Sequence, residues 1–190
     1  MAPVTRPAAP RIPPLGEDER DEAVQALLDE FVFGTTVNVY ATMARHPDVL
    51  ARCVRLGGEL RRGSLTVRER ELLILRTGWL CQSPYEFAQH ADLARAAGVT
   101  EEELDRIVDG PDAPGWEQDE ATLLRAADEL HETSSVSDGT WSNLVARYDE
   151  RQLIEVVMFC GYYHLISFFL NSLGVPLEEG KEPFRRFASG

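Results

Sequence analysis

The segment spanning residues 65–104 reads LTVRERELLILRTGWLCQSPYEFAQHADLARAAGVTEEEL, and it decides the fold class. Thr66 and Glu69 have the spacing of a capping box, which predicts that a helix begins directly after Thr66. The stretch 71–80 is apolar on nearly every side. An amphipathic surface helix has only one apolar stripe, so this pattern predicts a helix at the centre of the domain.

A second helix is predicted immediately after the first. Ser83 has the character of an N-cap, Pro84 suits the first helical position, and Glu86 has the spacing that closes a second capping box. Gly98 is predicted to end this helix. The segment therefore predicts two consecutive helices joined by a short turn.

The same helical periodicity continues on both sides of this segment, and no internal repeat or strand pattern interrupts it. The sequence predicts an all-α fold with about eight to nine helices. Residues 1–16 contain five prolines and are predicted to form an N-terminal arm, either disordered or wrapped around a neighbouring subunit, followed by a single helical domain over 17–190. The remaining helices are predicted at about 17–32 (ended by Gly34), 37–45, 48–60, 100–110, 117–132, 140–148 and 150–173.

The charge balance limits the possible partners. The chain has 32 acidic and 19 basic side chains, giving a formal net charge of −13. Such a field repels nucleic acids and anionic membrane surfaces, and a small acidic substrate would need a local basic patch. The sequence contains no apolar run of about 18 residues or more and no apolar leader, which predicts a soluble, cytoplasmic protein.

The three cysteines favour neither a disulfide nor a metal. Cys53, Cys81 and Cys160 are odd in number and far apart, and no CxxC pair is present. They are predicted to be small apolar residues of a helical core. Cys160 and His164 have i, i+4 spacing, but two ligands are too few for a metal centre, so no metal is predicted.

Glu71 is the first candidate for acid–base chemistry. It shares a helical stripe with apolar residues, and burial raises the pKa of a carboxyl group toward neutrality. A carboxyl group with such a pKa serves as a general acid or base. The alternative is a structural ion pair, with Arg68, Arg70 or Arg76 as partner.

His90 is the second candidate. It follows Glu86 by four residues and Ser83 by seven, so the three side chains share one face of the predicted helix. A histidine there titrates near working pH and suits proton transfer. The alternative is a core histidine bound to a carbonyl oxygen, and capping alone would explain both Ser83 and Glu86.

The segment 65–104 resembles the carboxymuconolactone decarboxylase family, which also contains the alkylhydroperoxidase-D-like proteins. The stretch YYHLISFFLNSLGVPLEEG, residues 162–180, resembles the end of its decarboxylase-like members. Together the resemblance covers about two-thirds of the chain. It implies an all-helical alkylhydroperoxidase-D-like fold, assembly into homo-oligomers (commonly trimers or hexamers), and an active site at a subunit interface.

The resemblance also extends to single residues of the family's motif. In the peroxidase branch a glutamate is followed by a CxxC pair and then a histidine, and here the glutamate is Glu71 and the histidine is His90. The two cysteine positions fall on Ser83 and Glu86. A peroxidatic cysteine needs a thiolate and a resolving thiol, so dithiol peroxidase activity is disfavoured.

The decarboxylase branch works without cofactor or metal. The resemblance therefore implies a carboxy-lyase or related acid–base enzyme that acts on a small lactone or enolisable carboxylic acid. His90 would move the proton at carbon, Glu71 would orient its imidazole, and Glu86 would be a second acid–base group. Tyr85, Ser83 and Arg76 are the predicted substrate-binding residues. The alternatives are a peroxiredoxin-like oxidoreductase and a non-catalytic oligomeric binding protein.

Overall fold

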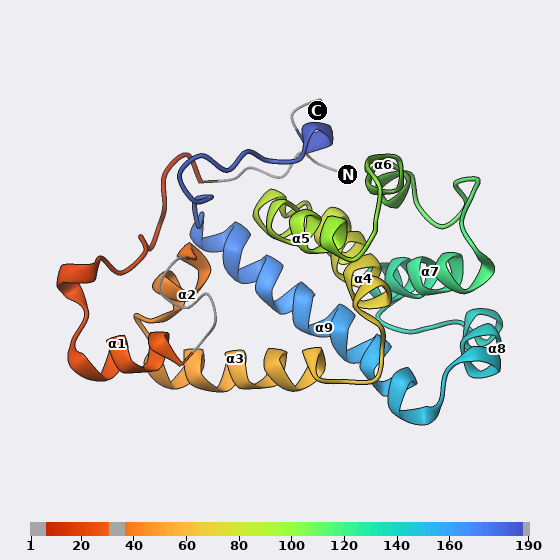
Figure 1. Cartoon of the computed structure of the whole chain (residues 1–190), viewed down its shortest axis with the longest axis horizontal. Helices are drawn as coiled ribbons and strands as arrows, with labels where there is room; N and C mark the ends of the chain where they lie inside the picture. The colour runs from red at the N-terminus through yellow and green to blue at the C-terminus, as the bar shows by residue number, and fades with distance from the viewer. Residues whose placement is uncertain (1–6, 31–36, 188–190) are drawn as a thin grey trace.

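The computed structural model describes residues 7–30 and 37–187, and within these ranges it is all helical, as predicted (Figure 1). The end of the predicted first helix and its break at Gly34 lie outside the described residues. The described part contains nine α-helices and two 3-10 turns: η1 Glu17–Glu19, α1 Glu22–Asp29, α2 Asn38–Met43, α3 Pro47–Arg61, α4 Val67–Leu80, α5 Pro84–Ala96, α6 Glu101–Asp109, α7 Gln118–Thr133, α8 Asp138–Arg147, α9 Glu150–Leu173 and η2 Arg185–Phe187.

Helix α4 is the centre of the molecule, which confirms the prediction from its composition. Every residue from Glu71 to Gly78 is buried. The helix packs against α5, α6, α7 and α9, and Figure 1 shows it enclosed between α5, α7 and the long diagonal α9. A buried helix of this kind fixes the direction of every side chain it carries, including the polar ones.

Helix α9 packs against α3, α4, α5, α7 and α8 along one side. It is long and apolar enough to cross a membrane, but 56% of its apolar window is buried inside the molecule, as expected of a core helix. Its other side carries an apolar stripe that no described residue covers. The stripe consists of Ile154, Val157, Met158, Leu165 and Phe168, which are 37–65% exposed.

The capping residues explain where most helices begin. Thr66 with Glu69 and Thr100 with Glu103 form complete capping boxes at the starts of α4 and α6. The predicted start at residue 17 is wrong, because 17–19 form a 3-10 turn and Asp21 caps α1 instead. The predicted start of α8 at Thr140 is also late, because the Ser137 side chain caps that helix.

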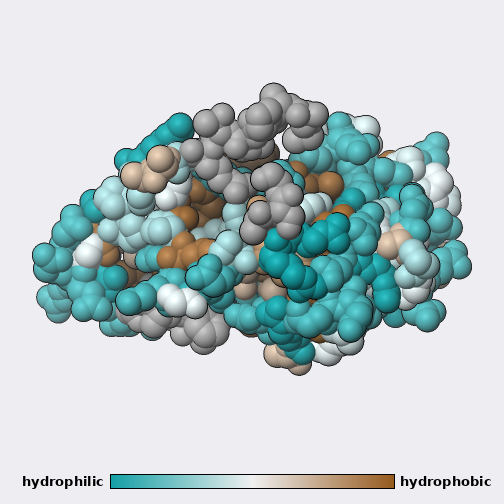
Figure 2. Space-filling model, turned by 90° about the horizontal axis from the view of Figure 1, so that it is seen from above, coloured by the Kyte–Doolittle hydropathy of each residue, from teal (hydrophilic) through white to brown (hydrophobic). Residues whose placement is uncertain are grey.

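The two ends of the described chain pack against the helices. The backbone N–H groups of Arg11 and Leu15 donate to the carbonyls of Leu173 and Ala41, so residues 7–16 of the arm lie along this chain's own α9 and α2. Near the other end, the Phe184 ring stacks on Phe87 of α5 with centroids 4.7 Å apart. Figure 2 shows the resulting face from above, mainly hydrophilic with apolar patches.

Candidate acid–base site

The site begins at the packing of α4 on α5. Glu71 projects from α4 and His90 from α5, and His90 Nδ1 lies 2.7 Å from Glu71 Oε2. Gly78 of α4 lies at this contact, and a Cβ built there would stand 3.5 Å from the Glu86 Cβ, an ordinary van der Waals separation.

Glu86 completes the site from the other side of the imidazole. Its Oε1 lies 3.1 Å from His90 Nε2, one helical turn along α5. The explanation of Glu86 by capping is therefore wrong: the Ser83 side chain makes no cap hydrogen bond, and Glu86 turns to His90 instead. The structure brings together all three predicted catalytic residues, here named the carboxylate–histidine cluster.

The cluster holds a positive charge between two negative ones. Glu71, Glu86 and His90 are all buried, with at most 8% exposure. Burial alone would lower the pKa of His90, but the charge and hydrogen bond of Glu71, joined by those of Glu86, outweigh it and raise the pKa to about 10. At neutral pH both ring nitrogens donate, and the ring is an imidazolium.

Tyr163 of α9 closes the cluster from a third element. Its ring meets the His90 ring edge to face at 5.0 Å. Burial raises the pKa of the Tyr163 phenol well above its ordinary value, and the nearby Glu86 and Glu71 add to this, so the phenol stays protonated. The apolar composition around Tyr163 indicated only a core residue, and nothing in its spacing pointed to His90.

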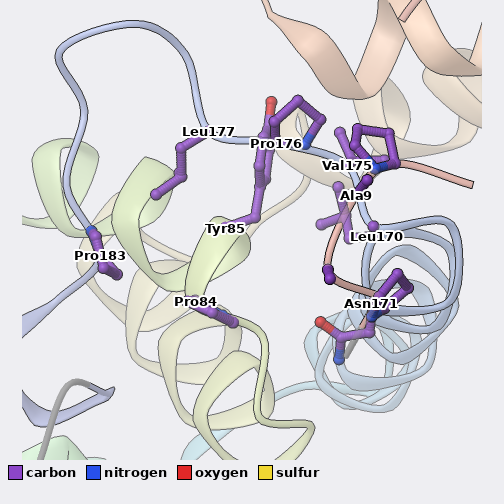
Figure 3. Close-up of a pocket in the computed structure, with 13 residues that line it drawn as sticks. Ala9, Pro84, Tyr85, Leu170, Asn171, Val175, Pro176, Leu177 and Pro183 are labelled. Atoms are coloured by element: carbon purple, nitrogen blue, oxygen red, sulfur yellow. The ribbon is translucent and has the colours of Figure 1, made fainter. Parts of the chain in front are cut away.

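Tyr85 belongs to a different part of the molecule. Its hydroxyl donates to Glu178 Oε1 at 2.5 Å and accepts from the Val39 backbone N–H at 3.1 Å. Tyr85 also lines a surface pocket of about 330 Å³ between the start of α5, the end of α9 and the arm (Figure 3). No member of the carboxylate–histidine cluster lines this pocket.

The other two predicted substrate-binding residues, Arg76 and Ser83, also make no hydrogen bond to the carboxylate–histidine cluster. Arg76 pairs with Asp128 of α7 at 2.5 and 2.9 Å and donates to the carbonyls of Ile107 and Val108, so its guanidinium is fully used in packing α4 on α6 and α7. Ser83 is fully buried, and its hydroxyl has no hydrogen-bond partner among the described residues.

The three cysteines are free thiols in this structure. Burial raises the pKa of Cys81 to about 11 and that of Cys160 to about 12, and it also raises the pKa of Cys53. A peroxidatic cysteine is a thiolate near neutral pH, so none of the three has the required charge state.

Comparison with known proteins agrees with the fold. Residues 47–129 match the model of the carboxymuconolactone decarboxylase family, and this range contains the whole carboxylate–histidine cluster. No curated protein matches the sequence.

Several solved structures share the alkylhydroperoxidase-D-like fold. The alkylhydroperoxidase AhpD core protein from Ralstonia eutropha JMP134, described as peroxidase-related, is 19% identical with a TM-score of 0.71, covering 97% of this chain and all of its own. A peroxidase-related protein from Silicibacter sp. TM1040 is 14% identical with a TM-score of 0.69, covering 98% and 95%. A variant of the debrominase Bmp8 in complex with 2,3,4-tribromopyrrole is 13% identical with a TM-score of 0.73, covering 88% and 91%. At these identities the likeness establishes the fold alone.

Proposed function

We propose that the protein is a cofactor-independent acid–base enzyme that acts on a small lactone or enolisable carboxylic acid. Its residues 47–129 belong to the carboxymuconolactone decarboxylase family. The observation that carries the proposal is the imidazolium of His90 held between Glu71 and Glu86 in a buried site. Burying three charged groups together costs free energy of desolvation. Groups of this kind cluster at functional sites, which favours a role in proton transfer.

We infer roles for these residues that differ from those expected from the sequence. Both nitrogens of His90 are engaged and its pKa is raised to about 10, so it is no base at neutral pH. Glu86 is the group that exchanges a proton with the substrate, since its Oε2 has no hydrogen-bond partner among the described residues. His90 holds the proton that balances the Glu86 charge, and Glu71 fixes the ring and its tautomer.

In a decarboxylation these roles form a complete cycle. The bond between the substrate's carbon and its carboxylate breaks, carbon dioxide leaves, and the electron pair delocalises into the adjacent carbonyl as an enolate. A proton passes from His90 through Glu86 to the carbon, and water then returns a proton to the site. The positive charge of His90 stabilises the enolate while it exists, in a site from which water is largely excluded.

We propose that the protein assembles as a homo-oligomer, such as a trimer or hexamer. The apolar stripe of α9 is a surface that a second copy would cover. It lies on the side of α9 that faces away from the carboxylate–histidine cluster, so this contact is separate from the buried site.

The test is carbon dioxide release from carboxymuconolactone and a panel of related lactone acids. Solvent deuterium incorporation at the acidic carbon is measured in parallel. Glu86→Gln keeps the side-chain shape but cannot exchange a proton, so we expect the rate to fall about 10²–10⁴-fold with the helical content unchanged. Glu102→Gln, an exposed glutamate on α6, is the matched control.

Full activity of Glu86→Gln, or no turnover and no exchange with any member of the panel, would contradict the proposal. Hydroperoxide consumption that requires Cys81 would instead favour the peroxidase alternative.

A further inference from the structure

A second group of chemically reactive side chains lies outside the carboxylate–histidine cluster. Cys81 follows the last turn of α4, His131 is near the end of α7, and His164 is in α9. The Cys81 sulfur and one ring nitrogen from each histidine all lie within 4.8 Å of one another. We name these three residues the thiol–histidine cluster. All three are half-buried, so solvent reaches them.

The backbone fixes the tautomer of His164. Its Nδ1 lies 2.7 Å from the Cys160 carbonyl oxygen, which can only accept, so Nδ1 carries the proton. In the neutral ring the lone pair is then on Nε2, which points at His131 Nδ1 from 2.9 Å. A histidine that donates one ring N–H to a carbonyl and presents the other nitrogen to a shared centre has the usual arrangement of a metal ligand.

The second histidine stands at the same point. Its Nδ1 lies 2.9 Å from His164 Nε2, and the two ring centroids are 5.2 Å apart. With its proton on Nε2, a neutral His131 presents the Nδ1 lone pair to a cation held between the two rings.

The surroundings of Cys81 suit a thiolate that is bound to a cation. Ser167 is fully buried, its hydroxyl makes no hydrogen bond of normal geometry to any described residue, and it lies beside the Cys81 sulfur. A buried hydroxyl without a partner is unfavourable. A metal-bound thiolate at Cys81 would be a strong acceptor for that hydroxyl.

We propose that the thiol–histidine cluster binds one Zn²⁺ ion through Cys81 Sγ, His131 Nδ1 and His164 Nε2. These three ligands leave the fourth tetrahedral position to a water molecule. Ligand atoms of a tetrahedral zinc site stand roughly 3.3–3.6 Å apart, so the observed spacings require only small side-chain rotations. One thiolate and two imidazoles favour zinc over magnesium or calcium, which prefer oxygen ligands.

This set departs from the sequence expectation, which paired His164 with Cys160. The Cys160 thiol is directed to Thr77, and only its carbonyl reaches His164. The true neighbours come from α4 and α7, far away in sequence, and no spacing rule connects them.

The experiment is a titration of reduced, chelator-treated protein with Zn²⁺ by calorimetry and with Co²⁺ by absorption. We expect one ion per chain, proton release as the Cys81 thiol ionises, and a thiolate-to-cobalt charge-transfer band. Cys81→Ser should abolish the band, and His131→Gln should weaken binding at least tenfold. Cys53→Ser and His46→Gln, which change a half-buried cysteine and an exposed histidine elsewhere, are the controls.

A further variant separates a built site from accidental coordination. Ser167→Ala leaves every ligand in place but removes the donor beside the sulfur, and we expect zinc affinity to fall about 10–100-fold. Circular dichroism checks that each variant is folded, and His131→Gln replaces Cys81→Ser if the latter is unstable. Absence of one-to-one binding by the wild type, or a charge-transfer band that survives Cys81→Ser, would overturn the proposal.

Discussion

The carboxylate–histidine and thiol–histidine clusters show how neighbours decide the charge of an imidazole. His90 lies between Glu71 and Glu86, and its pKa is raised to about 10 although it is buried. His131 is only half-buried, but burial and the facing imidazole of His164 together lower its pKa. The same side chain is thus a fixed cation in one place and a neutral donor–acceptor in the other.

The two clusters are also joined through the chain. Cys81 directly follows α4 and Glu86 lies in the first turn of α5, so one member of each cluster lies at either end of the short connection between these helices. The connection includes Gln82, a non-glycine residue with a positive φ of 52°. Such a backbone is held by its surroundings rather than preferred locally, so the packing of α4 on α5 positions both clusters at once.

The largest effect on stability is expected from removing the central cation, the imidazolium of His90. His90→Ala leaves Glu71 and Glu86 facing each other in a buried site without the charge that balances them. We expect a loss of about 3–5 kcal/mol in the free energy of unfolding, measured by urea denaturation at neutral pH. His46→Ala, which changes an exposed histidine, should cost far less.

A second substitution tests the reason for that loss. Adding Glu86→Gln to His90→Ala removes one of the two facing charges, so part of the lost stability should return. Equal losses for His90→Ala and His46→Ala would show that the buried charges do not interact as the geometry indicates.

A smaller effect is expected from pH, with opposite signs at the two histidines. The folded pKa of His90 is raised from 6.5 to about 10. Its stabilising contribution is therefore complete below pH 6.5 and is lost as the pH rises through about 10. The stability difference between wild type and His90→Gln should shrink by on the order of 2 kcal/mol between pH 6.5 and 9.

His131 should behave in the reverse manner. Its folded pKa lies below 6.5, so its contribution is complete above pH 6.5 and is lost as the pH falls. The difference between wild type and His131→Gln, measured by urea denaturation from pH 7 down to 5, should therefore change at the acidic side only. If the stability differences of His90→Gln and His131→Gln changed with pH in the same direction, the two histidines would not differ in charge as described.

Sequence reasoning was successful where local signals determine the structure. The capping box of Thr66 with Glu69 and the apolar run after it predicted α4 and its central position, because cap chemistry and burial pattern agree there. It failed at Glu17, because an acidic first turn occurs both there and at the true start of α1. Acidic residues favour any helix start and do not choose between two candidates.

The site could be predicted only in part. Glu71 and His90 were candidates from their positions on the predicted helices, and the family resemblance favoured them further. Glu86 fitted two explanations: three residues after Ser83 it could close a cap, and four before His90 it could pair with the ring. The structure shows the second. The thiol–histidine cluster depends on how α4, α7 and α9 pack, and that information is absent from any single helix.

The smallest expected effect concerns Ser83, which lies between Cys81 and Glu86. Replacing an N-cap serine by alanine usually costs about 1 kcal/mol, because the helix loses a hydrogen bond to its first turn. Ser83 makes no such bond, and its buried hydroxyl has no hydrogen-bond partner in the part of the chain that the structure describes. We therefore expect Ser83→Ala to change the free energy of unfolding by less than about 0.5 kcal/mol, or to raise it slightly.

Thr100→Ala is the matched control for this experiment, because the Thr100 hydroxyl accepts from the Glu103 backbone N–H in a complete capping box. That variant should lose about 1 kcal/mol, measured under the same conditions. If Ser83→Ala loses as much stability as Thr100→Ala, the Ser83 hydroxyl does cap α5. Glu86 is then free to leave His90. If stability is unchanged but turnover is lost, the orphaned hydroxyl binds the substrate beside Glu86. Either result would change the role of the connection that the two clusters share.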